Sequence, residues 1–329
     1  MSLIYPDHFK ILVTGGSGFI GYHLVNKLLN NTKATVYNLD KISYASNNFR
    51  LDNLYSDNKR YHFLKINLEN KENTYRAIEE ANPDIIFHLA AESHVDNSIN
   101  NPSPFIMSNI VGTFNLLEAA RKHFKNLPNE RKKHFIFQHI STDEVFGSLG
   151  LNGSFSESTN YDPRSPYSAS KAASDHLVRS WHHTYNFPIL ITNCSNNFGP
   201  GQFEEKLIPK AIKNALANKS IPLYGEGTNI RDWLYVEDHI DALLSVSKFG
   251  RIGQSYCIGG NGEKNNKEVL NLICNLLDEL VPKNETYSNL ITYVKDRPGH
   301  DFRYSINASK IKNDIGWEPK YSFLDSLRK

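Results

Sequence analysis

Two short motifs bring together side chains that can transfer protons. Tyr167 and Lys171 are four residues apart, so a helix would place the phenol and the ammonium on one face. A tyrosine has a pKa of about 10 in water and acts as a base near neutral pH only when a cation favours its phenolate. Upstream, Asp143 and Glu144 form a carboxylate pair that can serve as separate acid and base where their environments differ. The chain therefore carries two sets of proton-transfer groups.

The segments around these motifs alternate between two patterns. Apolar runs rich in β-branched residues are separated by longer segments with helical periodicity, which is typical of βαβ units and a parallel sheet. We expect strands at residues 10–15, 35–40, 61–66, 84–90, 134–140 and 188–193. We expect helices at residues 20–30, 72–81, 110–123 and 169–185. The predicted fold class is α/β, with a Rossmann-like, doubly wound parallel sheet.

The second half of the chain is less regular. After about residue 196, Gly and Pro interrupt the sequence at 198–201 and 221–227, which indicates loops and short elements around a ligand. A helix after residues 231–238 and a strand at 254–258 would return the chain to the main sheet. We therefore expect one domain from residues 1–196 and about 230–258. Residues of about 197–229 and 259–329 would form a smaller, mixed α/β lobe.

The composition excludes several classes of protein. The 37 basic and 35 acidic residues are spread along the 329-residue chain, without the basic stripe of a nucleic-acid binder. No apolar run approaches ~20 residues, and the first residues lack the pattern of a signal peptide. Three cysteines without C-x-x-C spacing favour buried thiols in a reducing compartment and argue against zinc. We expect a soluble, cytoplasmic protein with no metal and no contact with nucleic acid or membrane.

A glycine-rich turn follows the first expected strand. Gly15, Gly18 and Gly21 open a helix, where backbone N–H groups can face a pyrophosphate at the positive helix end. Asp40 ends the second expected strand, where a carboxylate accepts hydrogen bonds from a ribose 2′-OH. This carboxylate favours NAD over NADP, while the adjacent Lys41 points the other way. The context predicts a dinucleotide site rather than a purely structural turn.

Six segments occur in an order that carries a resemblance to a known family. They are residues 15–21, Leu-Ala-Ala-Glu-Ser-His-Val-Asp at 89–96, Ser-Thr-Asp-Glu-Val-Phe-Gly at 141–147, 167–171, Thr-Asn-Cys-Ser-Asn-Asn at 192–197 and Asp-Arg-Pro-Gly-His at 296–300. Over essentially its whole length, the chain resembles the nucleotide-sugar 4,6-dehydratases of the extended short-chain dehydrogenase/reductase superfamily. It is most similar to the dTDP-glucose 4,6-dehydratases. The Thr-Asp-Glu run and the Asn-Cys-Ser-Asn-Asn run are the most specific of these signals.

The resemblance implies a reaction in three steps that uses both proton-transfer sets. Tyr167, assisted by Lys171, would take the proton of the sugar 4-OH, which Thr142 orients, while C4 transfers a hydride to NAD. Glu144 would remove the C5 proton while a protonated Asp143 donates to the departing C6 hydroxyl. Return of the hydride to C6 would give a 4-keto-6-deoxy sugar. Asp143 can act as this acid near neutral pH only if burial or its anionic neighbour raises its pKa.

The resemblance also implies two sets of binding residues. The dinucleotide contacts would be Gly15, Gly18, Phe19, Ile20, Gly21, Asp40, Lys41, Tyr44, Asn67, Leu68, Leu89, Ala90, Ala91, Ser108, Tyr167, Lys171, Cys194 and Asn197. The contacts to the nucleotide sugar, which the smaller lobe would bind, would be Ser93, Thr142, Asn196, Lys206, Leu207, Pro222, Tyr224, Arg231, Asn266, Arg297 and His300. Relatives pair the helices expected at 110–123 and 169–185 across a two-fold axis, which implies a homodimer with a four-helix interface.

Some positions depart from the family pattern and leave alternatives open. Asn67 replaces a usual aspartate, Phe198 and Gly201 replace tyrosines, and Glu204 replaces a proline. The choice between dTDP-glucose and UDP-glucose therefore stays open. A nucleotide-sugar 4-epimerase and a UDP-glucuronate decarboxylase are the alternative enzymes, and an epimerase has no need of an acid/base pair at C5 and C6. A non-catalytic NAD-binding sensor is disfavoured because the complete proton-transfer set is present.

Overall fold

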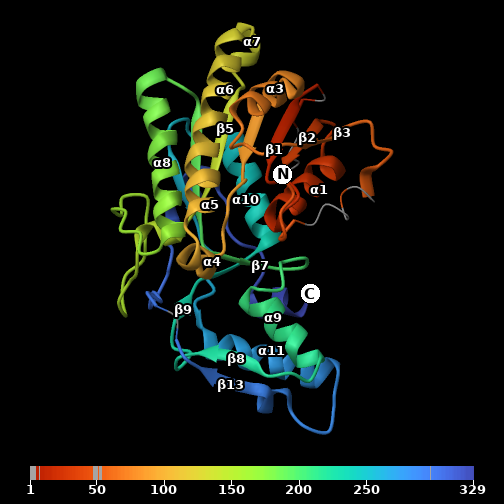
Figure 1. Cartoon of the computed structure of the whole chain (residues 1–329), viewed down its shortest axis with the longest axis vertical. Helices are drawn as coiled ribbons and strands as arrows, with labels where there is room; N and C mark the ends of the chain where they lie inside the picture. Colours follow the sequence, from red (N-terminus) through yellow and green to blue (C-terminus); the bar gives the residue numbers. More distant parts are fainter. Residues whose placement is uncertain (1–4, 7, 47–50, 52–53, 297) are drawn as a thin grey trace.

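A sheet of parallel strands forms the centre of the molecule (Figure 1). The computed structural model describes residues 5–6, 8–46, 51, 54–296 and 298–329. Within these residues the sheet contains seven strands, β1 (Lys10–Thr14), β2 (Thr35–Asp40), β3 (Tyr61–Lys65), β4 (Ile85–His88), β5 (Ile136–Thr142), β6 (Ile189–Cys194) and β11 (Ser255–Ile258). Their order is β11-β6-β5-β4-β1-β2-β3. The chain thus moves outward from β1 to β3 and returns on the other side of β1, which confirms the doubly wound sheet and the predicted return of residues 254–258.

Helices cover both faces of this sheet, because its strands are apolar on both sides. The helices of this part are α1 (Phe19–Asn31), α3 (Lys71–Ala81), α4 (Val95–Asn100), α5 (Ser103–Phe105), α6 (Gly112–Asn126), α7 (Asn129–Lys132), α8 (Pro166–Tyr185), α10 (Val236–Phe249) and α12 (Ser309–Ile315). Leu28 of α1 and Leu243 of α10 belong to one buried cluster. Leu116 of α6 and Val178 of α8 belong to a second cluster. The sheet is therefore sandwiched between two helical layers.

A smaller region continues from the carboxyl edge of the sheet and lies below it in Figure 1. It contains β7 (Asn196–Phe198), α9 (Leu207–Leu216), β8 (Ile221–Tyr224), β9 (Ile230–Arg231), β10 (Trp233–Tyr235), β12 (Lys264–Asn265), α11 (Asn266–Leu280), the 3₁₀ turn η3 (Tyr287–Leu290), β13 (Ile291–Val294) and α13 (Phe323–Arg328). Its strands pair as β7–β10, β8–β13 and β9–β12. Phe198, Leu223 and Ile273 form part of its own hydrophobic core.

The helix that carries Tyr167 and Lys171 starts at Pro166 rather than at residue 169. The side chain of Ser165 accepts a hydrogen bond from the Ser168 N–H (3.0 Å), and the Ser168 hydroxyl accepts one from the Ser165 N–H (3.0 Å). This capping box, with Pro166 at the first helical position, fixes the first turn of α8. Both chemically active side chains therefore lie in a well-anchored part of the helix.

Two short turns next to the site were not predicted. A π-helical segment, Ile106–Val111 (η1), precedes α6. Such segments often occur at functional sites. They have no sequence period of their own, so the sequence pattern does not reveal them. After β5, a 3₁₀ turn, Asp143–Phe146 (η2), begins where the Thr142 hydroxyl accepts the Glu144 N–H (3.2 Å). The carboxylate pair is therefore on a capped turn at the end of a central strand.

No described helix is both long enough and apolar enough to cross a membrane. Cys194, Cys257 and Cys274 are buried and not joined by disulfides, as expected of small buried hydrophobic residues.

Asp84 links the starts of two central strands and provides a test of the sheet. Its carboxylate accepts the Lys10 N–H (2.9 Å) and the Arg131 Nε–H (2.6 Å), and the side chain is only 4% exposed. We expect Asp84→Ala to lower the free energy of unfolding by about 2–4 kcal/mol, because it leaves both donors without an acceptor. Urea denaturation of the variant and the wild type measures this difference.

The matched control is Glu130→Ala, which removes a surface carboxylate that pairs with Lys133 and is 82% exposed. The expected change is below about 0.5 kcal/mol. Equal effects of the two substitutions would contradict the role assigned to Asp84.

Candidate active site

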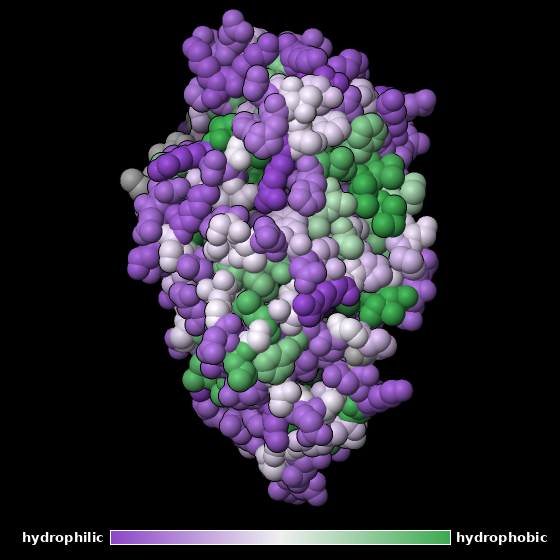
Figure 2. All heavy atoms as spheres, turned by 90° about the vertical axis from the view of Figure 1, so that its left-hand side faces the viewer, coloured by the Kyte–Doolittle hydropathy of each residue, from purple (hydrophilic) through white to green (hydrophobic). Residues whose placement is uncertain are grey.

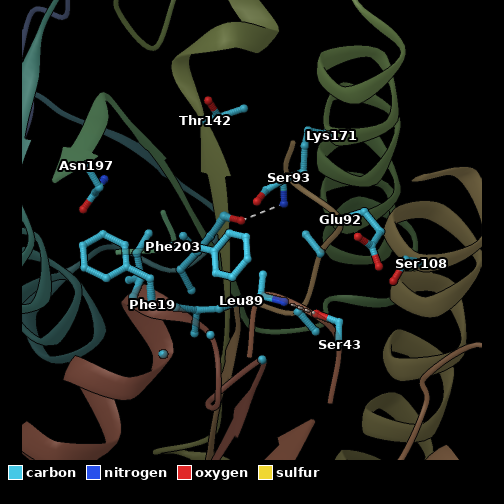
Figure 3. Close-up of a pocket in the computed structure, with 18 of the residues that line it drawn as sticks. Phe19, Ser43, Leu89, Glu92, Ser93, Ser108, Thr142, Lys171, Asn197 and Phe203 are labelled. Atoms are coloured by element: carbon cyan, nitrogen blue, oxygen red, sulfur yellow. Dashed lines mark hydrogen bonds between the residues drawn. The ribbon is translucent and has the colours of Figure 1, made fainter. Parts of the chain in front are cut away.

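A pocket opens at the carboxyl ends of β1, β2, β4, β5 and β6, beside the first turns of α8 (Figure 3). This is the switch point of the sheet, where open α/β folds bind ligands. Most residues proposed from the sequence line it: Gly15, Gly18, Phe19, Ile20, Gly21, Asp40, Lys41, Asn67, Leu68, Leu89, Ala90, Ala91, Ser93, Ser108, Thr142, Asp143, Glu144, Tyr167, Lys171, Cys194, Asn196, Asn197 and Lys206. The fold thus brings both proton-transfer sets and the glycine turn to one place.

The other predicted residues do not line this pocket. They are Tyr44, Leu207, Pro222, Tyr224, Arg231, Asn266 and His300, whereas Arg297 is outside the described residues. Tyr44 lies near the pocket, since its ring contacts that of Phe203, a lining residue (5.4 Å between centroids). The guanidinium of Arg231 donates to the carbonyls of Ile230 (2.7 Å) and Asp301 (3.0 Å).

The glycine turn leaves no room for larger side chains. Gly15 has a φ of +72°, and a Cβ at this position would lie 2.7 Å from the backbone nitrogen of Ala90. A Cβ at Gly21 would lie 2.1 Å from the carbonyl oxygen of Gly15. Gly18 precedes α1 and makes no side-chain cap, so the first N–H groups of the helix have no capping side chain. This arrangement suits an anionic group at the helix N-terminus.

Asp40 and Lys41 lie at the end of β2 on the same side of the pocket. The Asp40 carboxylate accepts the N–H groups of Ser17 (3.1 Å) and Ile42 (2.8 Å), and burial raises its pKa. The Lys41 ammonium lies 2.7 Å from a Glu92 oxygen, and Glu92 lies next to Ser108 in Figure 3. Lys41 is therefore already paired with a carboxylate, which weakens it as a partner for a phosphate.

Tyr167 and Lys171 are both almost fully buried, at 8% and 4% exposure. Burial raises the pKa of Tyr167 well above its ordinary value, Glu144 adds to this effect, and a hydrogen bond with Thr142 opposes it. The Lys171 ammonium donates to the carbonyl of Ile140 (2.8 Å). The phenol is therefore the stable form of Tyr167 here, and its deprotonation depends on positive charge nearby.

Asp143 has the environment that an acid catalyst requires. It is 1% exposed, and burial together with the charge of Glu144 raises the pKa of its carboxyl well above the ordinary value. One carboxyl oxygen is 3.3 Å from the Thr142 hydroxyl, and the other is buried and has no hydrogen-bond partner within the described part of the chain. A proton on Asp143 is thus favoured at a pH where an exposed aspartate is ionised.

Sequence reasoning missed several lining residues, including Glu92, Gln202, Phe203 and Glu205. Glu92 follows β4 within a motif already noted, but nothing local indicates that it pairs with Lys41. The remaining three belong to the loop before α9, which approaches the sheet only in the folded chain. Among the described residues, no three His, Cys, Asp or Glu side chains are grouped to hold a metal ion.

The buried acid predicts a pH-dependent stability difference between the wild type and Asp143→Asn. The folded-state pKa of Asp143 lies above the unfolded value, so the wild type is fully stable below the unfolded pKa and loses stability as pH rises through the folded pKa. Asparagine does not titrate. We expect the melting temperature of the variant, relative to the wild type, to rise by about 3 °C or more between about pH 4 and about pH 8.

Differential scanning fluorimetry across this pH range measures the effect. Asp162→Asn, at a carboxylate that is 68% exposed, is the control and should follow the wild type. A melting-temperature difference for Asp143→Asn that stays constant with pH would show that the carboxyl is not held in its neutral form.

Comparison with known proteins agrees with this geometry. The family model described as GDP-mannose 4,6 dehydratase matches residues 12–329. A dTDP-glucose 4,6-dehydratase of Shigella flexneri is 53% identical, over 97% of this chain and 91% of that protein. The solved dTDP-glucose 4,6-dehydratase of Bacillus anthracis, in complex with NAD, is 42% identical with a TM-score of 0.84, over 97% of this chain and 94% of that one. A UDP-glucose 4-epimerase of Thermus thermophilus in complex with NAD has a TM-score of 0.83 at 26% identity, over 97% and 96% of the chains. Because the match extends over nearly the whole chain, this protein belongs to the nucleotide-sugar 4,6-dehydratase family of the extended short-chain dehydrogenase/reductase superfamily.

Proposed function

We propose that this protein is a dTDP-glucose 4,6-dehydratase that uses NAD and converts dTDP-glucose into the 4-keto-6-deoxy sugar. The observation that carries the proposal is the meeting of three features in one pocket: the glycine turn, the pair Tyr167 and Lys171, and the pair Asp143 and Glu144. A 4-epimerase would have no use for a buried acid beside a second carboxylate. The dTDP-glucose 4,6-dehydratases of Shigella flexneri and Bacillus anthracis are 53% and 42% identical to this chain, whereas the UDP-glucose 4-epimerase of Thermus thermophilus is 26% identical. This difference favours dTDP over UDP.

The residues of the pocket fit NAD. The uncapped N-terminus of α1, at Gly18, can receive the pyrophosphate, and Asp40 can accept hydrogen bonds from a ribose. Lys41 is neutralised by Glu92 at 2.7 Å, and this disfavours NADP. NAD held there would supply a reversible hydride acceptor for C4 and a hydride donor for C6 of the sugar.

The first half of the reaction is assigned to Tyr167, Lys171 and Thr142. Tyr167, in its phenolate form, takes the proton from the 4-OH, and the hydrogen bond between Thr142 and Tyr167 holds the tyrosine oxygen toward the end of β5. Because burial and Glu144 oppose the phenolate, the ammonium of Lys171 must remain charged for this step.

The second half is assigned to the two carboxyl groups of η2. The 4-ketone makes the C5 proton acidic, and Glu144 removes it. Asp143, kept protonated by burial and by the charge of Glu144, donates its proton to the C6 hydroxyl as water leaves. Glu144 then returns the proton to C5. Tyr167 releases the proton that it took from the 4-OH and Asp143 takes one up, so all three groups regain their starting states.

The division of labour between two lobes is part of the proposal. The domain of residues 1–196 and about 230–258 would bind NAD, and the lobe of about 197–229 and 259–329 would bind the nucleotide sugar. Within these bounds, β9 and β10 pair with strands of the smaller lobe, and α12 packs against α10 and β11 of the larger domain. Asn196 and Lys206 line the pocket where β7 and the following loop reach it, which supports a substrate path toward this lobe. The buried Arg231 acts on Asp143 electrostatically and is a suitable partner for a diphosphate. Leu207, Pro222, Tyr224, Asn266, Arg297 and His300 would complete the substrate contacts.

A homodimer is also proposed. Hydrophobic residues gather among hydrophilic ones on the side of the molecule seen in Figure 2, and Ile106, Met107 and Phe114 are each at least 40% exposed. The Phe114 ring contacts Trp181 (6.0 Å between centroids), so α6 and α8 present one continuous surface. Two copies of this helix pair would cover the apolar side chains of each other.

Substrate turnover tests the function directly. Purified protein is incubated separately with dTDP-glucose and UDP-glucose, and mass spectrometry follows the product. We expect the loss of one water from dTDP-glucose, about tenfold or more faster than from UDP-glucose. Glu144→Gln should lower the rate by about 10²–10⁴-fold, because the C5 proton loses its base. Inactivity on both sugars, or turnover without change of mass, would overturn the proposal.

Sedimentation velocity tests the dimer. The wild type should sediment as a dimer, and Phe114→Glu as a monomer, because it places a charge in an apolar interface. Leu216→Glu is the matched control, since Leu216 is 53% exposed on α9, away from the proposed interface, and this variant should remain dimeric. A monomeric wild type would contradict the proposal.

A further inference from the structure

Asp175 continues the active face of α8 beyond the pocket. Tyr167, Lys171 and Asp175 follow one another at intervals of four residues in this helix, so their side chains lie along one face. Asp175 is completely buried, with 0% exposure. The proposed reaction gives it no task, although an ionised carboxylate at such a depth needs strong compensation.

The contacts of Asp175 favour its charged form. One carboxylate oxygen accepts the hydroxyl of Tyr161 (2.7 Å) and the side-chain N–H of Asn193 (3.2 Å). The other oxygen lies 3.1 Å from Nε2 of His139. Burial raises the pKa of Asp175, but the close approach of His139, the charge of Lys171 and the hydrogen bond from Tyr161 lower it by more, so that the net direction is downward. Asp175 is therefore a buried anion.

The neighbouring imidazole does not balance this charge. Burial lowers the pKa of His139 to about 4, so His139 is neutral near pH 7. The pKa of Lys171 is lowered by burial, while the charge of Asp175 opposes this loss. Without a carboxylate nearby, a buried ammonium tends to release its proton. The charges of Asp175 and Lys171 therefore each favour the ionised form of the other.

Other ionisable groups surround this pair. Arg179, on the far side of Asp175, donates to the Tyr161 hydroxyl (2.8 Å) and does not line the pocket. Titratable groups near the pair on the packed elements include His88 of β4, His139 of β5, Asp143 and Glu144 of η2, Tyr161, His176 and Tyr167 of α8 and its preceding loop, and Cys194 of β6. Glu118, Arg121, Lys122, His123 and Lys125 lie on α6, which packs against α8.

Asn193 extends the contact to the second proton-transfer set. Its side-chain nitrogen, which donates to Asp175, also lies within hydrogen-bonding distance of the carbonyl of Thr142 (3.2 Å). Thr142 ends β5 and immediately precedes the carboxylate pair. The carboxylate of Asp175 is thus connected to the strand end from which Asp143 and Glu144 project.

We propose that Asp175 is a positioning residue whose buried carboxylate keeps Lys171 in its ammonium form and, through Asn193, holds the end of β5 that carries Thr142. The inference rests on the proposed function only for the step that Lys171 assists. The charge relation between Asp175 and Lys171 exists without substrate, so it is measurable separately.

The first measurement is the reactivity of Lys171 in the free protein. Lys171 lines the pocket, and only its neutral amine is acylated by acetic anhydride. Mass spectrometry of the peptide that contains Lys171 gives its labelling rate against pH. In Asp175→Asn, which removes the charge and nearly keeps the shape, the neutral fraction at a given pH should rise by about tenfold, equal to one pKa unit. An unchanged labelling profile would overturn the proposal.

The second measurement is the pH dependence of dTDP-glucose turnover. The rate should fall at alkaline pH as Lys171 loses its proton. In Asp175→Asn this fall should begin about one pH unit lower than in the wild type. A uniform loss of rate with an unchanged profile would indicate a merely structural role and reject the proposal. Asp175→Ser also lacks the charge and replaces Asp175→Asn if that variant does not fold.

Asp238→Asn provides the matched control. Asp238 is equally buried, at 1% exposure, but it lies on α10 and accepts the N–H groups of Lys320 (3.1 Å) and Tyr321 (3.2 Å). This variant should lose stability and keep both wild-type profiles. A wild type without turnover but with the expected labelling shift would reject the proposed function alone. Normal wild-type turnover without a labelling shift would reject the role of Asp175 alone.

Discussion

The parallel pairing of β1 with β2 on one side and β4 on the other is the constraint on which the rest of the molecule depends. The connection after β1 leads to β2 on one side, whereas the connection after β4 leads to β5 on the other side. The two connections diverge, so the carboxyl ends of β1 and β4 stay open between them. A crevice opens there because of the topology and not because of any one side chain. The glycine turn after β1, the carboxylate at the end of β2 and the turn after β5 all reach it. The pocket is therefore a product of the sheet order.

Burial at this edge decides the chemistry of the side chains that meet there. Asp143 and Tyr167 are both pushed toward their neutral forms by loss of water and by the charge of Glu144. For the acid this is an advantage, whereas for the base it is an obstacle that a buried ammonium must offset. The charge of Asp175 favours the ammonium form of Lys171, and the charge of Lys171 favours the carboxylate form of Asp175. One helix thus carries both the base and the charges that sustain it.

Much of the fold was predictable from local sequence. The strands at 35–40 and 189–194 were found within one or two residues because runs of apolar, β-branched residues mark strands buried on both faces. The expected start of α8, at residue 169, lies three residues after the observed start at Pro166. The helix begins at a capping box formed by Ser165 and Ser168, where the apolar pattern is absent. The π-helical segment before α6 was not predicted at all. It changes the backbone hydrogen-bond pattern without changing the apolar period, and it brings Ser108 to the pocket.

The sequence by itself determined which groups are present: a glycine turn, an acid at the end of the second strand, and two proton-transfer sets. The spacing within each set shows that its members lie close together in the local backbone. Only the tertiary structure decided which of these groups are charged and paired. Glu92 pairs with Lys41, burial raises the pKa of Asp143, and Asp175 of α8 accepts a hydrogen bond from Asn193 of β6. The physical reason is that helix and strand periodicity acts over a few residues. Desolvation and Coulomb interactions depend instead on neighbours far apart in the chain, which become close only after the sheet has assembled.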